Sequence, residues 1–305
     1  AINLVPEAHL TQSLAPHWQK RFDKAIELLQ NNLDSEFNWQ QVADQCAISP
    51  SHFHYMFKLI FGEPPAQYQR RMRLKQATYA LSIDPTKSVT QIAMETGFSS
   101  SQALAKALKR ELGVSASMIR QSNGMESHDF WDDLMVKLGQ PKKDIQETLE
   151  TELSAQMVHA IVQRPASSFK TIKTQASNLD QSYENWGKMA PKDVMEGISI
   201  SSWESSLNPG EESFYVGYGC KPEIANIELP AQRYICSRVR VASGTGYVAA
   251  WDTLFRRILE NDYEPDYEAS VLEIMQAHRT VREVEQNELS EFETFPVIKA
   301  LAALD

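Results

Sequence analysis

The chain has 305 residues, a formal net charge of −10 and 42% hydrophobic residues. This length allows two domains, each with a core of its own. No apolar run approaches the roughly 18 residues of a membrane span, and the start lacks a signal-peptide pattern. The three cysteines, Cys46, Cys220 and Cys236, are too few for a disulfide framework and lack metal-finger spacing. We therefore expect a cytoplasmic protein with no membrane partner.

The charge is distributed unevenly along the chain. Residues 1–121 carry 13 Lys and Arg against 10 Asp and Glu, whereas residues 122–305 carry 17 against 30. A mildly basic first part and a strongly acidic second part are expected if only the first part meets phosphate. We predict a first domain over residues 1–121, a linker over 122–152 and a second domain over 153–305.

A short helical unit occurs twice in the first domain, at an offset of 50 to 51 residues. It follows a predicted helix over residues 17–33, and each copy predicts a helix, a tight turn and a second helix. Two recognition helices on one rigid body would read two successive major grooves of DNA. The copies are Val42-Ala43-x4-Ile48-Ser49-x7-Phe57-Lys58-x3-Gly62 and Ile92-Ala93-x4-Phe98-Ser99-x8-Leu108-Lys109-x3-Gly113.

A longer helix over residues 66–83 is predicted to connect the two copies. Its first half carries Arg70, Arg71, Arg73 and Lys75. Such a run can be a solvated face, but between two helix-turn-helix units it favours contacts with flanking DNA phosphates.

The second domain shows a mixed pattern of strands and helices. A strand at 157–162, a helix at 169–186 and strands at 198–203 and 214–220 are followed by a second set in the same order. That set has a strand at 234–241, a helix at 247–259 and strands at 269–275 and 292–298. Two βαββ units starting roughly 77 residues apart predict an internally duplicated α+β domain with a groove between its halves.

Residues 17–121 resemble the DNA-binding domain of the AraC/XylS transcription regulators. The resemblance includes Ile92-Ala93-x3-Gly97-Phe98 and Arg73-Leu74-x2-Ala77, besides the Phe57-Lys58-x3-Gly62 and Leu108-Lys109-x3-Gly113 of the repeat. The second domain resembles a GyrI-like effector-binding domain in element order, in Trp251 and in Phe295-Pro296-Val297. Together they imply a multidomain protein with an all-α, homeodomain-like double helix-turn-helix domain and a duplicated α+β domain.

The AraC/XylS resemblance assigns DNA-facing roles to particular residues. Side chains such as Gln102 and Lys106 can pair with adenine and guanine edges, and Tyr55 can contact a thymine methyl group. Ser51 and Tyr55 depart from the large aromatic residue and the Arg of many members, and Ala105 can make only apolar contact. We therefore expect the first half-site to contribute more of the sequence preference. The base-facing residues implied are Ser51, His54, Tyr55, Ser101, Gln102, Ala105 and Lys106, and the phosphate-facing ones are Ser49, Ser99, Arg70 and Arg71.

The GyrI-like resemblance implies a pocket for a small cationic or aromatic ligand. Tyr215 and Trp251 are the preferred aromatic residues for this pocket, although each could be ordinary core. Glu291 and Glu293 could clamp a cation, act as a catalytic pair, or keep an edge strand soluble.

Other motifs in the second domain carry weaker signals. Gly244-Thr245-Gly246-x2-Ala249 could be a dinucleotide loop, but it lies in a βαββ order and also fits an ordinary turn. His159 and His278 lack a partner at ligand spacing. We expect neither a metal nor a cofactor.

The expected protein is a transcription regulator and not an enzyme. Its expected partners are promoter DNA, a small-molecule effector and RNA polymerase. It could act as a monomer or a homodimer, because two reading helices on one chain can bind asymmetric DNA. The alternatives are an enzyme carried on the second domain and a second domain that binds a protein.

Overall fold

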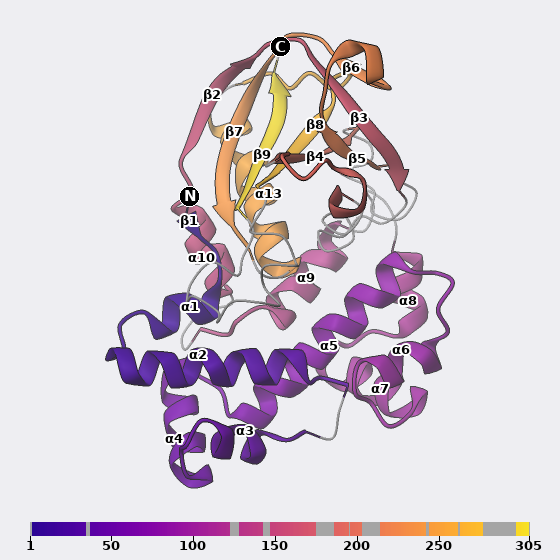
Figure 1. Cartoon of the computed structure of the whole chain (residues 1–305). Coiled ribbons are helices and arrows are strands. Elements are labelled where there is room, and N and C mark those ends of the chain that lie inside the picture. The colour runs from indigo at the N-terminus through magenta and orange to yellow at the C-terminus, as the bar shows by residue number, and fades with distance from the viewer. Residues whose placement is uncertain are drawn as a thin grey trace. The chain divides into compact units, whose positions relative to one another are not determined.

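The computed structural model describes residues 2–34, 37–122, 128–142, 147–174, 186–194, 196–202, 214–241, 244–261, 263–276 and 297–304. They divide into two compact units (Figure 1). One comprises Val5–Glu152, and the other comprises Ala1–Leu4 with Leu153–Asp305. Within the described residues, no helix is both long and apolar enough to span a membrane.

The first unit is helical. Two helices, α1 and α2, precede two helix-turn-helix units, and α5 joins these units. The bounds are α1 Pro6–Thr11, α2 Pro16–Asn31, α3 Trp39–Gln45, α4 Pro50–Phe61, α5 Pro65–Ile83, α6 Val89–Glu95, α7 Ser101–Ala107, the π-helical turn η1 Leu108–Leu112, α8 Ala116–Gln121 and α9 His128–Leu138. Helix α10, Leu149–Ala155, continues into the second unit.

The first helix-turn-helix consists of α3 and α4 around an aromatic core. Asn38 and Gln41 form a capping box at the start of α3, which satisfies backbone N–H groups of its first turn. Phe53 and Phe57 are fully buried, and Phe53 stacks on Phe22 of α2 with ring centroids 5.8 Å apart. Large aromatic burial on the inner side of α4 fixes which face of this recognition helix remains exposed.

The second helix-turn-helix consists of α6 and α7, and its turn differs from the first by one residue. The N-cap of α7 is Ser100, whose hydroxyl accepts a hydrogen bond from Ala103 N at 3.1 Å. Ser99, expected to face a phosphate at the start of this helix, lies one residue before that N-cap and outside the helix. Ser49 does occupy the N-cap of α4, but its side chain makes no capping hydrogen bond. The extra residue therefore lies in the turn, and the two recognition helices correspond at an offset of 51.

Helix α5 contributes to both cores of the first unit. Tyr68 and Met72 belong to the core of the first helix-turn-helix, while Leu74, Ala77 and Leu81 belong to that of the second. One helix shared by two cores makes a rigid connection, because neither core can move without disturbing its packing.

The segment expected to be a linker packs instead as part of the first unit. Leu134 and Leu138 of α9 are buried in the core of the second helix-turn-helix, and Gln140 is 1% exposed. The linker prediction was therefore wrong for residues 128–142. The sequence predicts a short helix around residues 128–138 as well. It was assigned to a linker because Gln121-Ser122-Asn123-Gly124 precedes it and a polar stretch up to Glu150 follows it.

The second unit contains one mixed sheet of nine strands among the described residues, and helix α13 packs on it. The order is β1-β7-β9-β8-β4-β5-β3-β6, and β2 pairs with β7 beside β1. Every pair except β1 with β7 is antiparallel. The bounds are β1 Ile2–Asn3, β2 His159–Arg164, β3 Ser167–Thr174, β4 Glu196–Ser201, β5 Phe214–Gly219, β6 Ile227–Leu229, β7 Gln232–Arg240, α13 Gly244–Glu260, β8 Val271–Gln276 and β9 Val297–Leu304.

The helix predicted over residues 169–186 is wrong at its start. Residues 169–174 belong to β3 and pair with β5 in continuous antiparallel register. Phe169 and Thr171 are buried, whereas Lys170 and Lys173 are exposed. Residues 186–189 are helical, and residues 175–185 lie outside the described part of the chain. The predicted strands at 198–203, 214–220, 234–241 and 269–275 and the predicted helix at 247–259 overlap β4, β5, β7, β8 and α13.

The sheet has a different core on each face. Ile235 and Val271 pack with Leu254 and Ile258 of α13 on one face. Their neighbours Tyr234 and Leu272 belong to a separate cluster with Phe169, Ile198, Ile200 and Ile274. Successive strand residues point to opposite faces, so this alternation determines which side chains can meet near α13.

Candidate DNA-binding surface and ligand site

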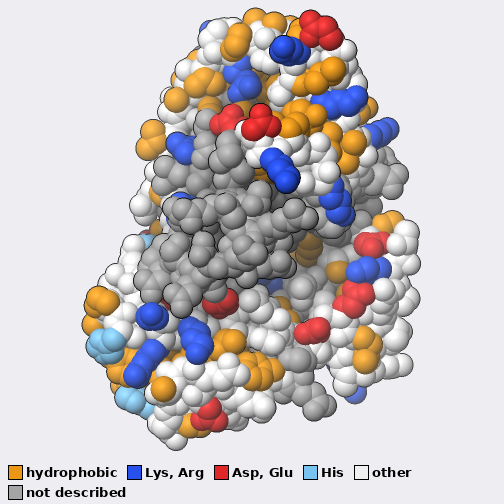
Figure 2. Space-filling model, in the orientation of Figure 1, with side chains coloured by type: hydrophobic (Ala, Val, Ile, Leu, Met, Phe, Trp, Pro, Cys, Tyr) orange, Lys and Arg blue, Asp and Glu red, His pale blue; other side chains and the backbone are white. Residues whose placement is uncertain are grey.

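Recognition helices α4 and α7 present matched exposed faces. In α4 the exposed side chains recur at helical spacing, and five of the six positions 51 residues later in α7 and η1 are exposed as well. In Figure 2, Lys and Arg side chains lie beside hydrophobic and histidine side chains on the helical unit. The matched pairs are Ser51 with Gln102, His54 with Ala105, Tyr55 with Lys106, Lys58 with Lys109 and Leu59 with Arg110.

The two exposed faces differ in chemistry. Tyr55 and Leu59 are 67% and 62% exposed and form an apolar pair one turn apart on α4. Lys106 and Arg110 occupy the same two positions in the second copy. An apolar pair suits contact with thymine methyl groups, whereas two cations suit phosphate or guanine. Ser101, at the first turn of α7, is only half-buried and donates to Gln102 at 3.3 Å.

The basic residues of α5 do not form one exposed group. The Arg70 side chain is 55% exposed and lies 3.5 Å from Glu111. Arg73 donates from Nε to the carbonyl oxygen of Leu33 at 2.9 Å, across to the end of the α2 region. Lys75 lies 3.9 Å from the buried Glu150. Of the two arginines expected at phosphates, only Arg70 is accessible to DNA.

Arg71 is buried in a polar cluster, which corrects its expected role at phosphate. It is 8% exposed, and its guanidinium donates to Glu63 Oε1 at 2.5 Å from Nη2 and 3.1 Å from Nε. It also donates to Leu138 O at 3.0 Å and to Gln140 Oε1 at 2.9 Å. Burial acts to lower the pKa of Arg71, but Glu63 outweighs it and the pKa is raised. Arg71 therefore remains charged inside the unit.

The aromatic pair expected to line a ligand pocket is separated by the sheet. Trp251 of α13 packs with Ile235 and Leu254 on the helix face. Tyr215 of β5 packs with Ile198 and Ile200 on the opposite face. Tyr215 and Trp251 therefore do not share a site, because strand alternation directs Tyr215 away from α13. Glu291 and Glu293 lie outside the described residues.

The structure instead brings a carboxylate to Trp251. Glu273 on β8 is half-buried and accepts a hydrogen bond from Trp251 Nε1 at 3.1 Å and another from the hydroxyl of Tyr247. Burial raises the pKa of Glu273, while the two donors oppose that rise. Sequence reasoning did not select this residue. The sequence feature that could have identified it is a single acidic residue inside the apolar run Val271-Leu272-Glu273-Ile274.

Small residues flank Glu273 in the sheet. Ser199 of β4 is its register partner on one side and is buried, and Ala300 of β9 is its partner on the other side. Directly paired strand residues point to the same face. Glu273 thus stands on the helix face of the sheet next to one aromatic donor and one phenol, and a small residue occupies the neighbouring position on β4.

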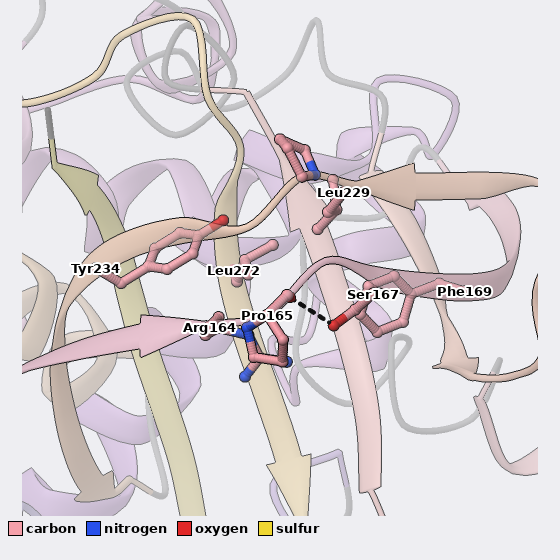
Figure 3. Close-up of a pocket in the computed structure, with 8 residues that line it drawn as sticks. Arg164, Pro165, Ser167, Phe169, Leu229, Tyr234 and Leu272 are labelled. Atoms are coloured by element: carbon pink, nitrogen blue, oxygen red, sulfur yellow. Dashed lines mark hydrogen bonds between the residues drawn. The ribbon is translucent and has the colours of Figure 1, made fainter.

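A small cavity lies on the other face of the sheet (Figure 3). Arg164, Phe169, Tyr234 and Leu272 are among its lining residues, and Ser167 donates to Pro165 O at 2.9 Å beside it. About 170 Å³ is free of atoms there, but none of it accepts a water-sized sphere. It is a gap in packing with no room for a ligand.

The Gly244-Thr245-Gly246 loop opens α13, but its surroundings differ from those of a dinucleotide site. Strand β9 lies between β7 and β8, so the two strands that α13 connects are not neighbours. A dinucleotide-binding βαβ unit places its parallel strands side by side at the loop. Among the described residues, no group of three or more His, Cys, Asp or Glu could hold a metal.

Known proteins resemble portions of the chain. A helix-turn-helix domain family model matches residues 42–122. The HTH-type transcriptional activator RhaS of Escherichia coli is 35% identical over 101 residues, which is 33% of this chain and 36% of RhaS. The chain therefore spans about a third of the length of the curated relatives it matches.

Two solved structures are each similar to a portion of the chain. The DNA-binding domain of AdpA in complex with a target DNA is 26% identical and covers 33% of this chain and 89% of its own, with a TM-score of 0.31. SAV2435 bound to tetraphenylphosphonium is 11% identical and covers 49% of this chain and 94% of its own, with a TM-score of 0.35.

The helical fold, the matched exposed faces of α4 and α7 and the family match define the class of the first unit. It contains a DNA-binding domain of the helix-turn-helix type. The similarity to RhaS, an HTH-type transcriptional activator, accompanies this match.

Proposed function

We propose that this protein is a one-component transcription regulator that binds promoter DNA with its first unit and senses a small cationic or aromatic molecule with its second. The observation that carries the first part is the pair of matched exposed faces on α4 and α7, joined by one helix shared between two cores. Such a body presents two recognition helices at a fixed separation, as a bipartite major-groove reader requires. RNA polymerase as a partner, a monomeric or homodimeric state and a cytoplasmic location belong to the same proposal.

The proposed second domain is a duplicated, GyrI-like fold. The strand order supports it: β3-β5-β4 on one side of the central pair mirrors β7-β9-β8 on the other. In this interpretation β3, and not β2, begins the first repeat and corresponds to β7. The helix of the second repeat is α13.

The first test asks whether α7, the second recognition helix, contacts a base through Gln102. Its exposed amide can donate to and accept from an adenine edge, so Gln102→Ala should cost about 1 to 3 kcal/mol of specific binding and relax discrimination at one base pair. The measurement is the affinity of the full chain for a duplex selected from a random pool and for its single-base variants. Equal losses on selected and random duplexes would refute the base contact.

Arg70→Ala supplies the matched control for that test. Arg70 is an exposed cation on α5, so its loss should weaken binding to all duplexes by a similar factor and reduce the salt dependence.

The proposed effector site centres on Glu273. A carboxylate on the helix face of the sheet, with Trp251 beside it, can attract a cation electrostatically and stack with an aromatic group. The Tyr247 and Trp251 donors orient the carboxylate and can be released to a ligand. A small residue at Ser199 leaves the neighbouring sheet position without a bulky side chain.

Glu273→Gln is expected to reduce binding of a delocalised aromatic cation at least tenfold, with tetraphenylphosphonium as the probe. The substitution preserves the shape of the side chain and one acceptor oxygen, which can still accept from Tyr247 and Trp251, but it removes the charge. The neutral triphenylphosphine oxide should bind both forms with similar affinity. Because the Glu273 pKa is raised, cation binding to the unmodified chain should weaken as the pH falls through that pKa. Calorimetric titration measures all of these values, and equal cation affinity for both forms would refute the site.

A further inference from the structure

We propose that the segment 128–142 acts as a staple that sets the separation of the two recognition helices, with Lys137 and Gln140 as its positioning residues. This inference rests on the proposed bipartite reading of DNA. The segment lies beyond residues 42–122, which match the helix-turn-helix family model.

The staple contacts the same structural position in both copies. Gln140 Nε2 donates to the carbonyl oxygen of Phe61, the last residue of α4, at 2.7 Å. Lys137 Nζ donates to the carbonyl oxygen of Leu112, the last residue of η1, at 3.1 Å. Phe61 and Leu112 correspond at the 51-residue offset of the recognition helices, and each precedes a glycine in the left-handed conformation.

These two bonds have a physical reason to form at those positions. The last carbonyl groups of a helix lack partners within the helix and carry the negative end of its dipole. A lysine ammonium and an amide N–H group are suitable donors to them. Two donors three residues apart in the chain thus tie the ends of both recognition helices to one short segment.

Gln140 is itself fixed on three sides. Its Oε1 accepts from Arg71 Nη2 at 2.9 Å, and its backbone N–H group donates to Glu150 Oε2 at 2.9 Å. Leu138 O accepts from Arg71 Nη1 at 3.0 Å, so the turn after α9 is held on α5. Leu134 and Leu138 anchor α9 in the second core. Asp133 also forms an ion pair with Lys137, but its side chain is 60% exposed, so this pair contributes little to the position of Lys137.

The staple therefore gives α4 and α7 a second connection besides α5. Two connections at different points restrain both the distance and the angle between the helices more strongly than α5 does alone. Binding to two half-sites depends on that geometry, while binding to one half-site does not.

The test compares half-site spacings. Duplexes selected by the full chain from a random pool provide a bipartite site, from which we would prepare versions with one base pair inserted or deleted between the halves, and each half alone. For the unmodified chain, one inserted base pair should weaken binding about tenfold, because it displaces and rotates the second half-site. In Lys137→Met, and more strongly in Lys137→Met with Gln140→Met, this penalty should fall at least about threefold while half-site affinities stay within about twofold.

Asp133→Asn serves as the control, since it removes the ion pair of Lys137 but leaves its bond to Leu112. Its spacing profile should match that of the unmodified chain. Lys137→Met alters a partly exposed side chain and should fold normally, so it keeps the test valid if the double variant unfolds.

The possible results distinguish a failure of the proposed DNA-binding function from a failure of the staple proposal alone. If no duplex is enriched from the pool, the DNA-reading function fails and the staple with it. If duplexes are enriched but the variants keep the spacing penalty of the unmodified chain, or weaken on all duplexes by one factor, the staple alone is overturned.

Discussion

Gly97→Ala is expected to destabilise the first unit by about 3 kcal/mol or more, the sum of backbone strain and overpacking. Gly97 occupies the turn of the second helix-turn-helix with φ +79°, where a Cβ atom is strained. An added Cβ would also lie 1.9 Å from Leu33 O and 2.7 Å from Arg73 Nε. The carbonyl is backbone, so the helices would have to separate. Amide hydrogen exchange of α6 and α7 in the full chain measures this loss.

Gly113→Ala isolates the backbone part of that effect. Gly113 has the same φ of +79°, but nothing lies within 4 Å of a Cβ added there. We expect a loss of only about 1 to 2 kcal/mol, the cost of a left-handed conformation alone. Equal losses for the two variants would show that the approach of Leu33 to Gly97 does not matter for stability.

Arg71→Met is expected to cost about 3 to 5 kcal/mol, because it leaves Glu63 as an uncompensated charge in the interior. Glu63 is 2% exposed, and its carboxylate accepts two hydrogen bonds from Arg71 through Nε and Nη2. The substitution also removes the donor to Leu138 O. Urea unfolding of the full chain, followed by hydrogen exchange in α5, measures the change.

Arg70→Met is the neighbouring control for the effect of Arg71. Its exposed side chain should change stability by less than about 0.5 kcal/mol while weakening DNA binding and its salt dependence. In contrast, Arg71→Met molecules that are folded should bind DNA with the same salt dependence as the unmodified chain. If Arg71→Met is stable and its DNA affinity depends less on salt, Arg71 contacts a DNA phosphate after all, contrary to what its burial indicates.

Local sequence patterns were sufficient to predict the helix-turn-helix units and several strands. Apolar spacing of 3.6 residues in α2, α4 and α5 and the glycines at 62, 97 and 113 are signals written within a few neighbouring residues. The AraC/XylS resemblance implied the DNA-facing roles of His54, Tyr55, Gln102 and Lys106. Their exposure agrees with the helical periodicity, because the buried face of each helix determines the opposite one.

The same reasoning failed where local signals conflicted or were weak. In residues 169–174, Phe169 and Ile172 stand among polar neighbours at a spacing that also fits a helix. These residues form a strand because they pair with β5. Glu273 is one acid in an apolar run, and only the approach of α13 gives it two donors. The pair of Tyr215 and Trp251 was separated because strand pairing, and not residue type, determines which face a side chain occupies.

Helical periodicity and the repeat at an offset of 50 to 51 residues were enough to predict two linked helix-turn-helix units, and the uneven charge favoured the first part of the chain as the part that meets DNA. The tertiary structure alone decided that Arg70 is accessible and Arg71 buried, that residues 128–142 join the first unit, and that Glu273 meets Trp251. The physical reason is the range of the interactions. Periodicity and capping act within one or two turns, whereas Arg71 meets Gln140, 69 positions later in the sequence, only after the chain folds back onto α5.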